Sequence, residues 1–264
     1  MKDTSLLEAH YQKFNEEKRL TRRHGQVEYL TTLHYIHHYL NQLSQPRETI
    51  QLLDIGCGTG RYAVSLADCG YDVSAIELIK YNVGVLKAKK SSVKAYQGNA
   101  LNLKKFKDGQ FDVCLLLGPM YHLFELEDKV QALNEAKRVT KKGGLIFVAY
   151  LMNEYGVLVH GFRDQYIHES IKNQKLDRNF HIQNSKEDLY DYVRIEDIDH
   201  YNTLVGIKRL QMISATGAAN YMRSTLNAMD EETFALFMKY HLSTCERADL
   251  MGASSHVVDI LTVE

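Results

Sequence analysis

The feature that most constrains the fold is the stretch between residues 51 and 64, with the sequence QLLDIGCGTGRYAV. Its first part, residues 51–55, is an apolar run typical of a strand that is buried on both faces in a parallel sheet. Gly56, Gly58 and Gly60 follow, and glycines tolerate positive φ angles and let a ligand approach the backbone closely. A segment with helical spacing comes next. The stretch therefore predicts a strand, a ligand-binding loop and a helix.

The spacing of these glycines separates two kinds of cofactor. A pyrophosphate on a helix N-terminus requires G-x-G-x-x-G, whereas this loop reads G-x-G-x-G, which argues against a dinucleotide. With Asp54 at the end of the apolar run, the stretch resembles the first motif of the class I S-adenosylmethionine-dependent methyltransferases, D-x-G-x-G-x-G. The resemblance implies S-adenosyl-L-methionine as cofactor, and an ordinary glycine-rich turn is the alternative. The residues assigned to the cofactor here are Asp54, Gly56, Cys57, Gly58 and Gly60.

Chain length and net charge limit the kinds of molecule that the protein is expected to bind. A chain of 264 residues has room for one large α/β domain, or for one such domain with an inserted cap. Its 32 basic and 33 acidic residues give a net charge of −1, so no global basic field favours nucleic acid or a membrane. The cysteines are scattered, and the N-terminus lacks the apolar core of a signal peptide. We expect a cytoplasmic protein with a small-molecule substrate; the sequence gives no indication of oligomeric state.

A second strand is predicted over Tyr71–Glu77, and its last residue is acidic. A carboxylate at this strand end can accept hydrogen bonds from both ribose hydroxyls, and Glu77 lies about 20 residues past the glycine loop, as that role requires. Leu78, next to it, is assigned to the same site. A solvated strand end is the alternative. We expect Glu77→Ala to weaken cofactor binding and to leave stability nearly unchanged.

A third strand is predicted over Val93–Tyr96, and Asn99 follows it. The resembling methyltransferases commonly carry an acid there that accepts from the adenine amino group. An amide oxygen can accept the same bond, while the backbone N–H of Ala100 donates to the ring. The alternative is that Asn99 serves only as a turn residue.

The fourth strand, Phe111–Leu117, leads into Gly118-Pro119-Met120-Tyr121-His122. Ligands of open α/β sheets bind outside the carboxyl ends of the strands, so Leu117 is assigned to the cofactor site, and Tyr121 and His122 are expected to face the substrate. His122 is a candidate general base because imidazole titrates near neutral pH, and Tyr121 is the second candidate for this catalytic role. The alternative is that His122 has a structural role and packs under the loop at the start of a helix.

The resemblance implies one class I methyltransferase domain over residues 1–264, with a doubly wound, mostly parallel seven-stranded sheet, helices on both faces and an antiparallel last strand. Residues 1–43 are predicted to form a helical lid and a packing helix, with Tyr11 and Arg19 near the cofactor. Residues 153–192 are polar and long for a connection, which predicts a helical cap insertion. Further along we expect a helix over Glu127–Thr140 closed by a glycine C-cap at residues 141–144, and another helix over Ile195–Leu210.

No metal site is predicted, because the histidines at positions 34, 37 and 38 and the pair His241 and Cys245 lack further ligands. The first hypothesis is an S-adenosylmethionine-dependent methyltransferase that acts on a small molecule by in-line transfer. The second is a regulator that binds the cofactor without turnover. An RNA methyltransferase is the third, disfavoured by the balanced charge.

Overall fold

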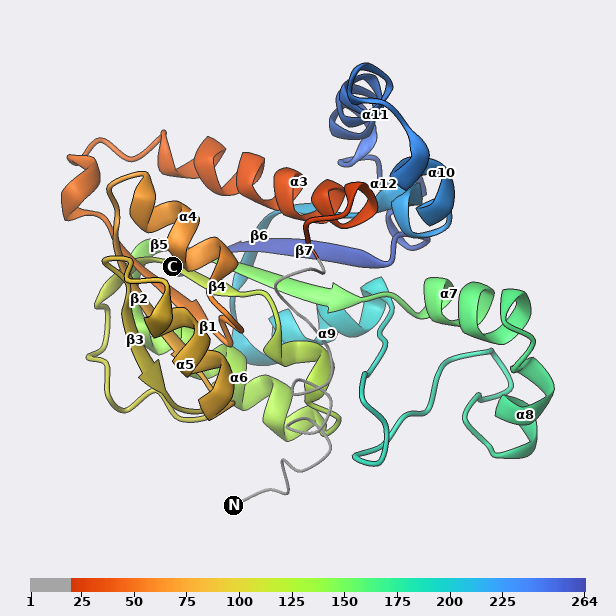
Figure 1. The fold of residues 1–264 in the computed structure, drawn as a ribbon. Helices are drawn as coiled ribbons and strands as arrows, with labels where there is room; N and C mark the ends of the chain where they lie inside the picture. The colour runs from red at the N-terminus through yellow and green to blue at the C-terminus, as the bar shows by residue number, and fades with distance from the viewer. Residues whose placement is uncertain (1–19) are drawn as a thin grey trace.

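The computed structural model describes residues 20–264, so the predictions for Tyr11 and Arg19 lie outside the described residues. Within this range the strands form one seven-stranded sheet, in the order β3-β2-β1-β4-β5-β7-β6 (Figure 1). The strands are β1 Gln51–Ile55, β2 Asp72–Glu77, β3 Lys94–Gln97, β4 Phe111–Leu116, β5 Thr140–Leu151, β6 Lys208–Ser214 and β7 His256–Thr262.

The sheet has the predicted doubly wound topology. β1 pairs in parallel with β2 and with β4, and β3 and β5 extend the parallel part on either side. β7 runs antiparallel to both β5 and β6, which confirms the antiparallel last strand. Its first residue, His256, lies opposite Leu151 at the end of β5. The N-terminal end of β7 therefore lies at the same edge as the carboxyl ends of the parallel strands.

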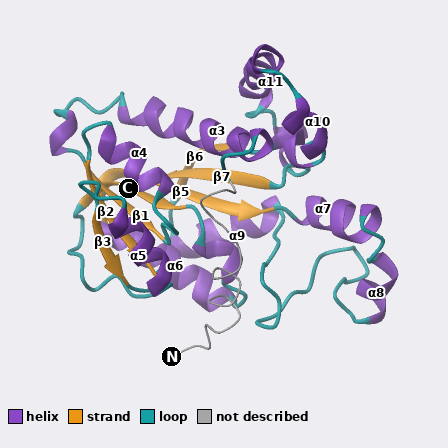
Figure 2. Cartoon of the chain, viewed as in Figure 1, coloured by secondary structure: helices purple, strands orange, loops and turns teal. Residues whose placement is uncertain are grey.

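Helices cover both faces of the sheet, as Figure 2 shows. The helical elements are α3 Arg23–Leu40, α4 Arg61–Asp68, α5 Lys80–Ala88, α6 Leu126–Val139, α7 Asn153–Gly156, α8 Ile167–Lys172, α9 Ile195–Val205, α10 Arg223–Ala228, α11 Glu231–Thr244 and α12 Ala248–Met251, with short turns η1 Arg47–Thr49, η2 Pro119–His122 and η4 Gly217–Asn220, and a π-helix η3 Val157–Arg163. α3 corresponds to the packing helix expected before the first strand.

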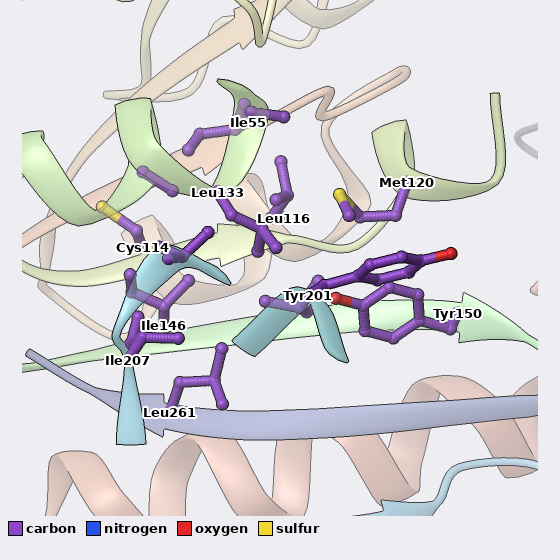
Figure 3. Packing of buried hydrophobic residues seen from close by; sticks show 14 of the residues in the cluster. Ile55, Cys114, Leu116, Met120, Leu133, Ile146, Tyr150, Tyr201, Ile207 and Leu261 are labelled. Atoms are coloured by element: carbon purple, nitrogen blue, oxygen red, sulfur yellow. The ribbon is translucent and has the colours of Figure 1, made fainter. Parts of the chain in front are cut away.

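Two apolar clusters hold these layers together, one on each face. The cluster in Figure 3 joins the sheet to α6 and α9, with Leu133 and Tyr201 packed against strand residues such as Ile146. The other joins the sheet to α3 and α4, and includes Ile36 and Leu66. All six residues of β4 are buried, as expected for a central parallel strand with a helix layer on each face.

Two helix ends differ from the predictions. α6 ends at Val139, because Thr140 already has an extended backbone and pairs with Phe111, so residues 140–144 belong to β5 and are not a glycine C-cap. α9 ends at Val205, five residues earlier than expected. Gly206 has φ +61° and closes α9 in the left-handed conformation that glycine readily adopts.

The segment 153–192 leaves and rejoins the sheet at one point. The Val193 N–H donates to the Leu151 carbonyl at 2.9 Å, and the Asn153 N–H donates to the Val193 carbonyl at 2.9 Å. Between these contacts the chain forms α7, η3, α8 and an irregular return, which extend beyond the end of β5 (Figure 1).

Candidate active site

The glycine loop has the backbone that only glycine adopts easily. Gly56, Gly58 and Gly60 have φ angles of +70°, +54° and +82°. A Cβ on Gly56 would lie 2.6 Å from Cγ of Pro119, and one on Gly60 would lie 2.4 Å from Cδ1 of Leu86. The loop is therefore held between the start of η2 and α5, where a side chain at Gly56 or Gly60 would have no room.

Glu77 joins the loop to the end of β2. Its Oε2 accepts the Gly58 N–H at 2.8 Å, and its Oε1 accepts the Ile79 N–H at 2.8 Å. The residue is 7% exposed, so it is not a solvated strand end. Burial raises the pKa of this carboxyl, although the N–H groups of Ile79 and Gly58 act in the opposite direction. Each carboxylate oxygen has a second acceptor position that a ribose hydroxyl can use.

Asp54 lies beside Glu77 and is 3% exposed. Its Oδ2 is buried without a hydrogen-bond partner among residues 20–264. Burial, and then the charge of Glu77, raise the pKa of Asp54 to about 7. A buried carboxylate oxygen without a donor is costly, so this atom fits a ligand that brings a positive charge or a donor. The residues present thus fit a nucleoside ligand that carries a cationic group.

The remaining predicted cofactor residues lie around the same strand ends. Asn99 Oδ1 accepts the Leu101 N–H at 2.9 Å, which is the turn contact of the alternative interpretation. Contact of Asn99 and Ala100 with adenine stays a prediction, as do the roles of Leu78 and Leu117. Cys57 is half-buried among the loop residues, and desolvation raises the pKa of its thiol well above the usual value, which keeps the sulfur protonated.

His122 and Tyr121 lie on η2, directly after β4. The Nδ1 of His122 lies 2.9 Å from the Leu189 carbonyl, which can only accept, so Nδ1 carries the proton. In the neutral ring Nε2 is then the basic nitrogen. The Tyr121 hydroxyl donates to the Leu117 carbonyl at 3.1 Å. The structure therefore brings both residues to the predicted edge of the sheet.

Sequence reasoning missed four residues that reach this edge by tertiary contacts. They are Tyr190, His256, Glu28 and Asp191. The ring of Tyr190 lies 5.4 Å from His122 and 6.0 Å from Tyr121 between centroids. His256, at the start of β7, lies 6.0 Å from the Tyr121 ring, and its Nδ1 is 3.7 Å from Oε2 of Glu28 on α3. The predicted antiparallel last strand could have indicated His256, because such a strand begins at the edge of the sheet where its parallel neighbours end.

The fourth missed residue, Asp191, joins the segment 153–192 to α6. Its Oδ2 pairs with Nζ of Lys129 at 2.7 Å, and Lys129 is 2% exposed and also donates to the Leu123 carbonyl. The Asp191 N–H donates to the Tyr121 carbonyl at 2.8 Å. Burial raises the pKa of Asp191, while the charge of Lys129 lowers it. The ion pair thus connects the segment to α6, and the Asp191 N–H connects it to η2.

Two classes of site are absent from the described part of the chain. Residues 20–264 contain no group of three or more histidine, cysteine or acidic side chains placed to hold a metal. In the same range, no helix combines the length and the apolar character needed to cross a membrane.

The sheet order, the glycine loop after β1 and the buried acid after β2 define a Rossmann-like nucleoside-binding protein. Residues 53–148 match the family model described as "Methyltransferase domain". This part of the chain thus matches a methyltransferase domain, and the chain shares the fold of solved S-adenosylmethionine-dependent methyltransferases. A methyltransferase from Methanosarcina mazei shares the fold with a TM-score of 0.57 and 15% identity, over 87% of this chain and 96% of that one.

Curated relatives match over a similar region. A ubiquinone biosynthesis O-methyltransferase from Pelagibacter ubique is 33% identical over 110 residues, which are 40% of this chain and 44% of the relative. A tRNA (carboxymethyluridine(34)-5-O)-methyltransferase of Xenopus tropicalis is 28% identical over 109 residues, 39% of this chain and 16% of that protein. The chain thus matches less than half the length of either relative.

Proposed function

We propose that the protein transfers a methyl group from S-adenosylmethionine to a small-molecule acceptor. The observation that carries this proposal is the pair of buried acids at the glycine loop, where Glu77 holds the Gly58 N–H and Asp54 keeps an unpaired Oδ2. Asp54, Glu77 and the loop would hold the cofactor. The ubiquinone-biosynthesis relative supports a small acceptor, and the net charge of −1 disfavours RNA.

When bound, the cofactor supplies an activated methyl group: the acceptor atom bonds to the methyl carbon while the carbon–sulfur bond breaks and sulfur keeps the electron pair. The protein's main task is to hold the acceptor in line, and good orientation can contribute roughly 7–11 kcal/mol. Where the acceptor carries a proton, Nε2 of His122 takes it. Leu189 fixes the ring for this role by accepting from Nδ1.

Calorimetric titration with S-adenosylhomocysteine and with NAD tests the cofactor assignment. We expect S-adenosylhomocysteine to bind and NAD not to bind, because the loop offers a ribose site without a pyrophosphate seat. Tight NAD binding with no response to S-adenosylhomocysteine would overturn the proposal. Transfer of label from the cofactor into a metabolite extract, without nucleic acid, then separates an enzyme from a binding regulator and from an RNA methyltransferase.

The same transfer assay tests His122. His122→Asn keeps a donor for the Leu189 carbonyl and removes the basic nitrogen, so turnover should fall roughly 10²–10⁴-fold while S-adenosylhomocysteine binds as before. Tyr121→Phe tests the other candidate catalytic residue in the same assay, because it removes the hydroxyl that donates to the Leu117 carbonyl. Wild-type turnover in His122→Asn would remove the base from the mechanism.

A further inference from the structure

Arg223, the first residue of α10, carries a charge that has no counter-charge in the described part of the chain. Its Nε–H donates to Oδ1 of Asn220 at 3.2 Å, and its Nη2 donates to the Tyr155 hydroxyl at 3.1 Å. Both partners are neutral, and no carboxylate of residues 20–264 lies within ion-pair distance of the guanidinium. Arg194, by contrast, pairs with an acid at 2.8 Å. Arg223 therefore presents an unbalanced positive charge.

Buried groups hold this guanidinium in one orientation. Tyr155 and Asn220 are both buried, and the Asn220 amide nitrogen donates to Oγ of Ser255 at 2.8 Å, which leaves Oδ1 to face Arg223. The two bonds use Nε and one hydrogen of Nη2, so both hydrogens of Nη1 and the second hydrogen of Nη2 remain for a ligand. Arg223 itself is exposed. The cation is thus oriented in advance and still accessible.

Arg223 lies at the same edge of the sheet as the candidate active site. α10 and α7 both extend beyond the end of β5 (Figure 1). Ser255 Oγ, which accepts from Asn220, lies 3.1 Å from Nδ1 of His256, and the ring of His256 lies 6.0 Å from that of Tyr121. A continuous series of contacts therefore joins the guanidinium to η2.

A second series of contacts runs through tyrosines of the segment 153–192. Burial raises the pKa of Tyr192, and the charge of Arg223 acts in the opposite direction, so these two side chains are near each other. Tyr190 also affects the pKa of Tyr192, and the ring of Tyr190 lies 5.4 Å from that of His122. A ligand held by Arg223 can therefore extend along these rings to the candidate base.

Among anions, a carboxylate fits this cation best. The two nitrogens Nη1 and Nη2 of a guanidinium present parallel N–H donors that match the two oxygens of a carboxylate. Arg223 supplies a single positive charge, which a carboxylate balances. A phosphate monoester carries a charge of about −1.5 to −2 at neutral pH and would leave an excess of negative charge.

We propose that Arg223 binds a carboxylate of the methyl acceptor, so that the acceptor is an anionic small molecule. This inference rests on the proposed function and adds the substrate class to it. The carboxylate accepts from Nη1 and Nη2 of Arg223, while the atom that receives the methyl group lies at η2, on the far side of His256 and Tyr190. The acceptor is therefore an elongated molecule with these two groups at opposite ends.

Calorimetric titration in the presence of saturating S-adenosylhomocysteine tests the carboxylate site, with benzoate as the probe and benzyl alcohol as its neutral counterpart. We expect benzoate to bind and benzyl alcohol not to bind. Arg223→Gln should weaken benzoate binding roughly ten- to hundred-fold, because hydrogen bonds to a charged group are lost. Arg223→Lys should be intermediate, since lysine keeps the charge and lacks the paired donors. Arg247→Gln is the matched control, because Arg247 is exposed and already pairs with Asp249 at 2.7 Å.

Three results would overturn the carboxylate site. Benzoate might fail to bind to wild type, it might bind equally to Arg223→Gln, or benzyl alcohol might bind to wild type as tightly as benzoate. In each case S-adenosylhomocysteine binding to the same samples shows whether the cofactor assignment stands on its own. Tighter binding of phenyl phosphate than of benzoate would overturn the choice of a carboxylate over a phosphate.

The labelled-transfer assay separates this proposal from the proposed function. The methylated product from a metabolite extract should be retained on an anion exchanger at about pH 7 and released at about pH 2, where a carboxylate is protonated. A product that is not retained would overturn the substrate class and leave methyl transfer in place. If neither transfer nor S-adenosylhomocysteine binding occurs while benzoate binds to wild type and not to Arg223→Gln, the proposed function is wrong and the carboxylate site remains.

Discussion

Glu77 serves the protein itself as well as its proposed ligand. Its two carboxylate oxygens hold the Gly58 and Ile79 N–H groups, so the acid sets the position of the glycine loop before any ligand binds. This changes the expectation from sequence that Glu77→Ala leaves stability unaffected. The sequence pattern places an acidic residue at the end of the second strand. It does not show that the carboxylate oxygens of Glu77 also accept hydrogen bonds from the backbone.

We therefore expect Glu77→Ala to lower both properties. Affinity for S-adenosylhomocysteine should fall at least ten-fold, and stability should fall by about 1–3 kcal/mol for each buried N–H that loses its acceptor. Glu77→Gln should be intermediate, because it keeps one acceptor oxygen. Calorimetry and denaturant unfolding measure the two effects. The control is Glu127→Ala, an exposed acid at the start of α6. An unchanged unfolding midpoint in Glu77→Ala would show that the loop does not depend on this contact.

At the scale of elements, the buried pair Lys129–Asp191 connects α6 to the segment 153–192. In a buried ion pair each charge offsets the cost of removing the other from water. If one partner is removed, the remaining charge is buried without a counter-charge, which is destabilising. The Asp191 backbone also holds η2 through the Tyr121 carbonyl. The ion pair and this backbone hydrogen bond thus act together to position the helix, the segment and the candidate base.

Lys129→Met should accordingly destabilise the protein, by up to about 3–5 kcal/mol, since it leaves a largely buried carboxylate without its cation. Limited proteolysis should show earlier cleavage between residues 153 and 192 than in wild type. Lys94→Met is the comparison: the Lys94 side chain is 54% exposed in its pair with Asp72, and pairs of this kind contribute about 0–1 kcal/mol. Equal losses in the two variants would contradict the role of the buried pair.

The elements from β1 to β4 could be predicted because their signals are local. A buried strand, three glycines with positive φ and a strand-end acid can all be recognised within a few residues of each other. The segment 153–192 could not be resolved into elements, because α7 and α8 have four and six residues and are separated by a π-helix. Tyr190 and His256 reach the site only through long-range contacts, which no local pattern records.

At the scale of the whole molecule, two buried groups make stability depend on pH in opposite directions. Burial lowers the pKa of His241 to about 4, so the unfolded chain takes up a proton first as pH falls below 6.5, and stability declines until about pH 4. Asp54 has a raised pKa of about 7, so the unfolded chain loses a proton first as pH rises above 3.8, and stability declines until about pH 7.

Between about pH 4.5 and 6.5 these two slopes should nearly cancel, because each group contributes about 1.4 kcal/mol per pH unit with opposite sign. His241→Gln removes the His241 contribution, so its stability should rise on acidification relative to wild type. Asp54→Asn removes the Asp54 contribution, so its stability should fall on acidification relative to wild type. Urea unfolding at several pH values in this range measures both. Parallel profiles for the two variants would contradict the assignment.

Because residues 153–192 leave and rejoin the sheet through paired backbone groups of Leu151, Asn153 and Val193, this segment can be exchanged without changing the strand order. Doubling the length of such a loop costs only about 0.6 kcal/mol in closure entropy. The family match ends at residue 148, shortly before the segment departs. A laboratory chimera that replaces residues 153–188 and keeps Asp191 as the partner of Lys129 should therefore retain the strand order and the glycine loop.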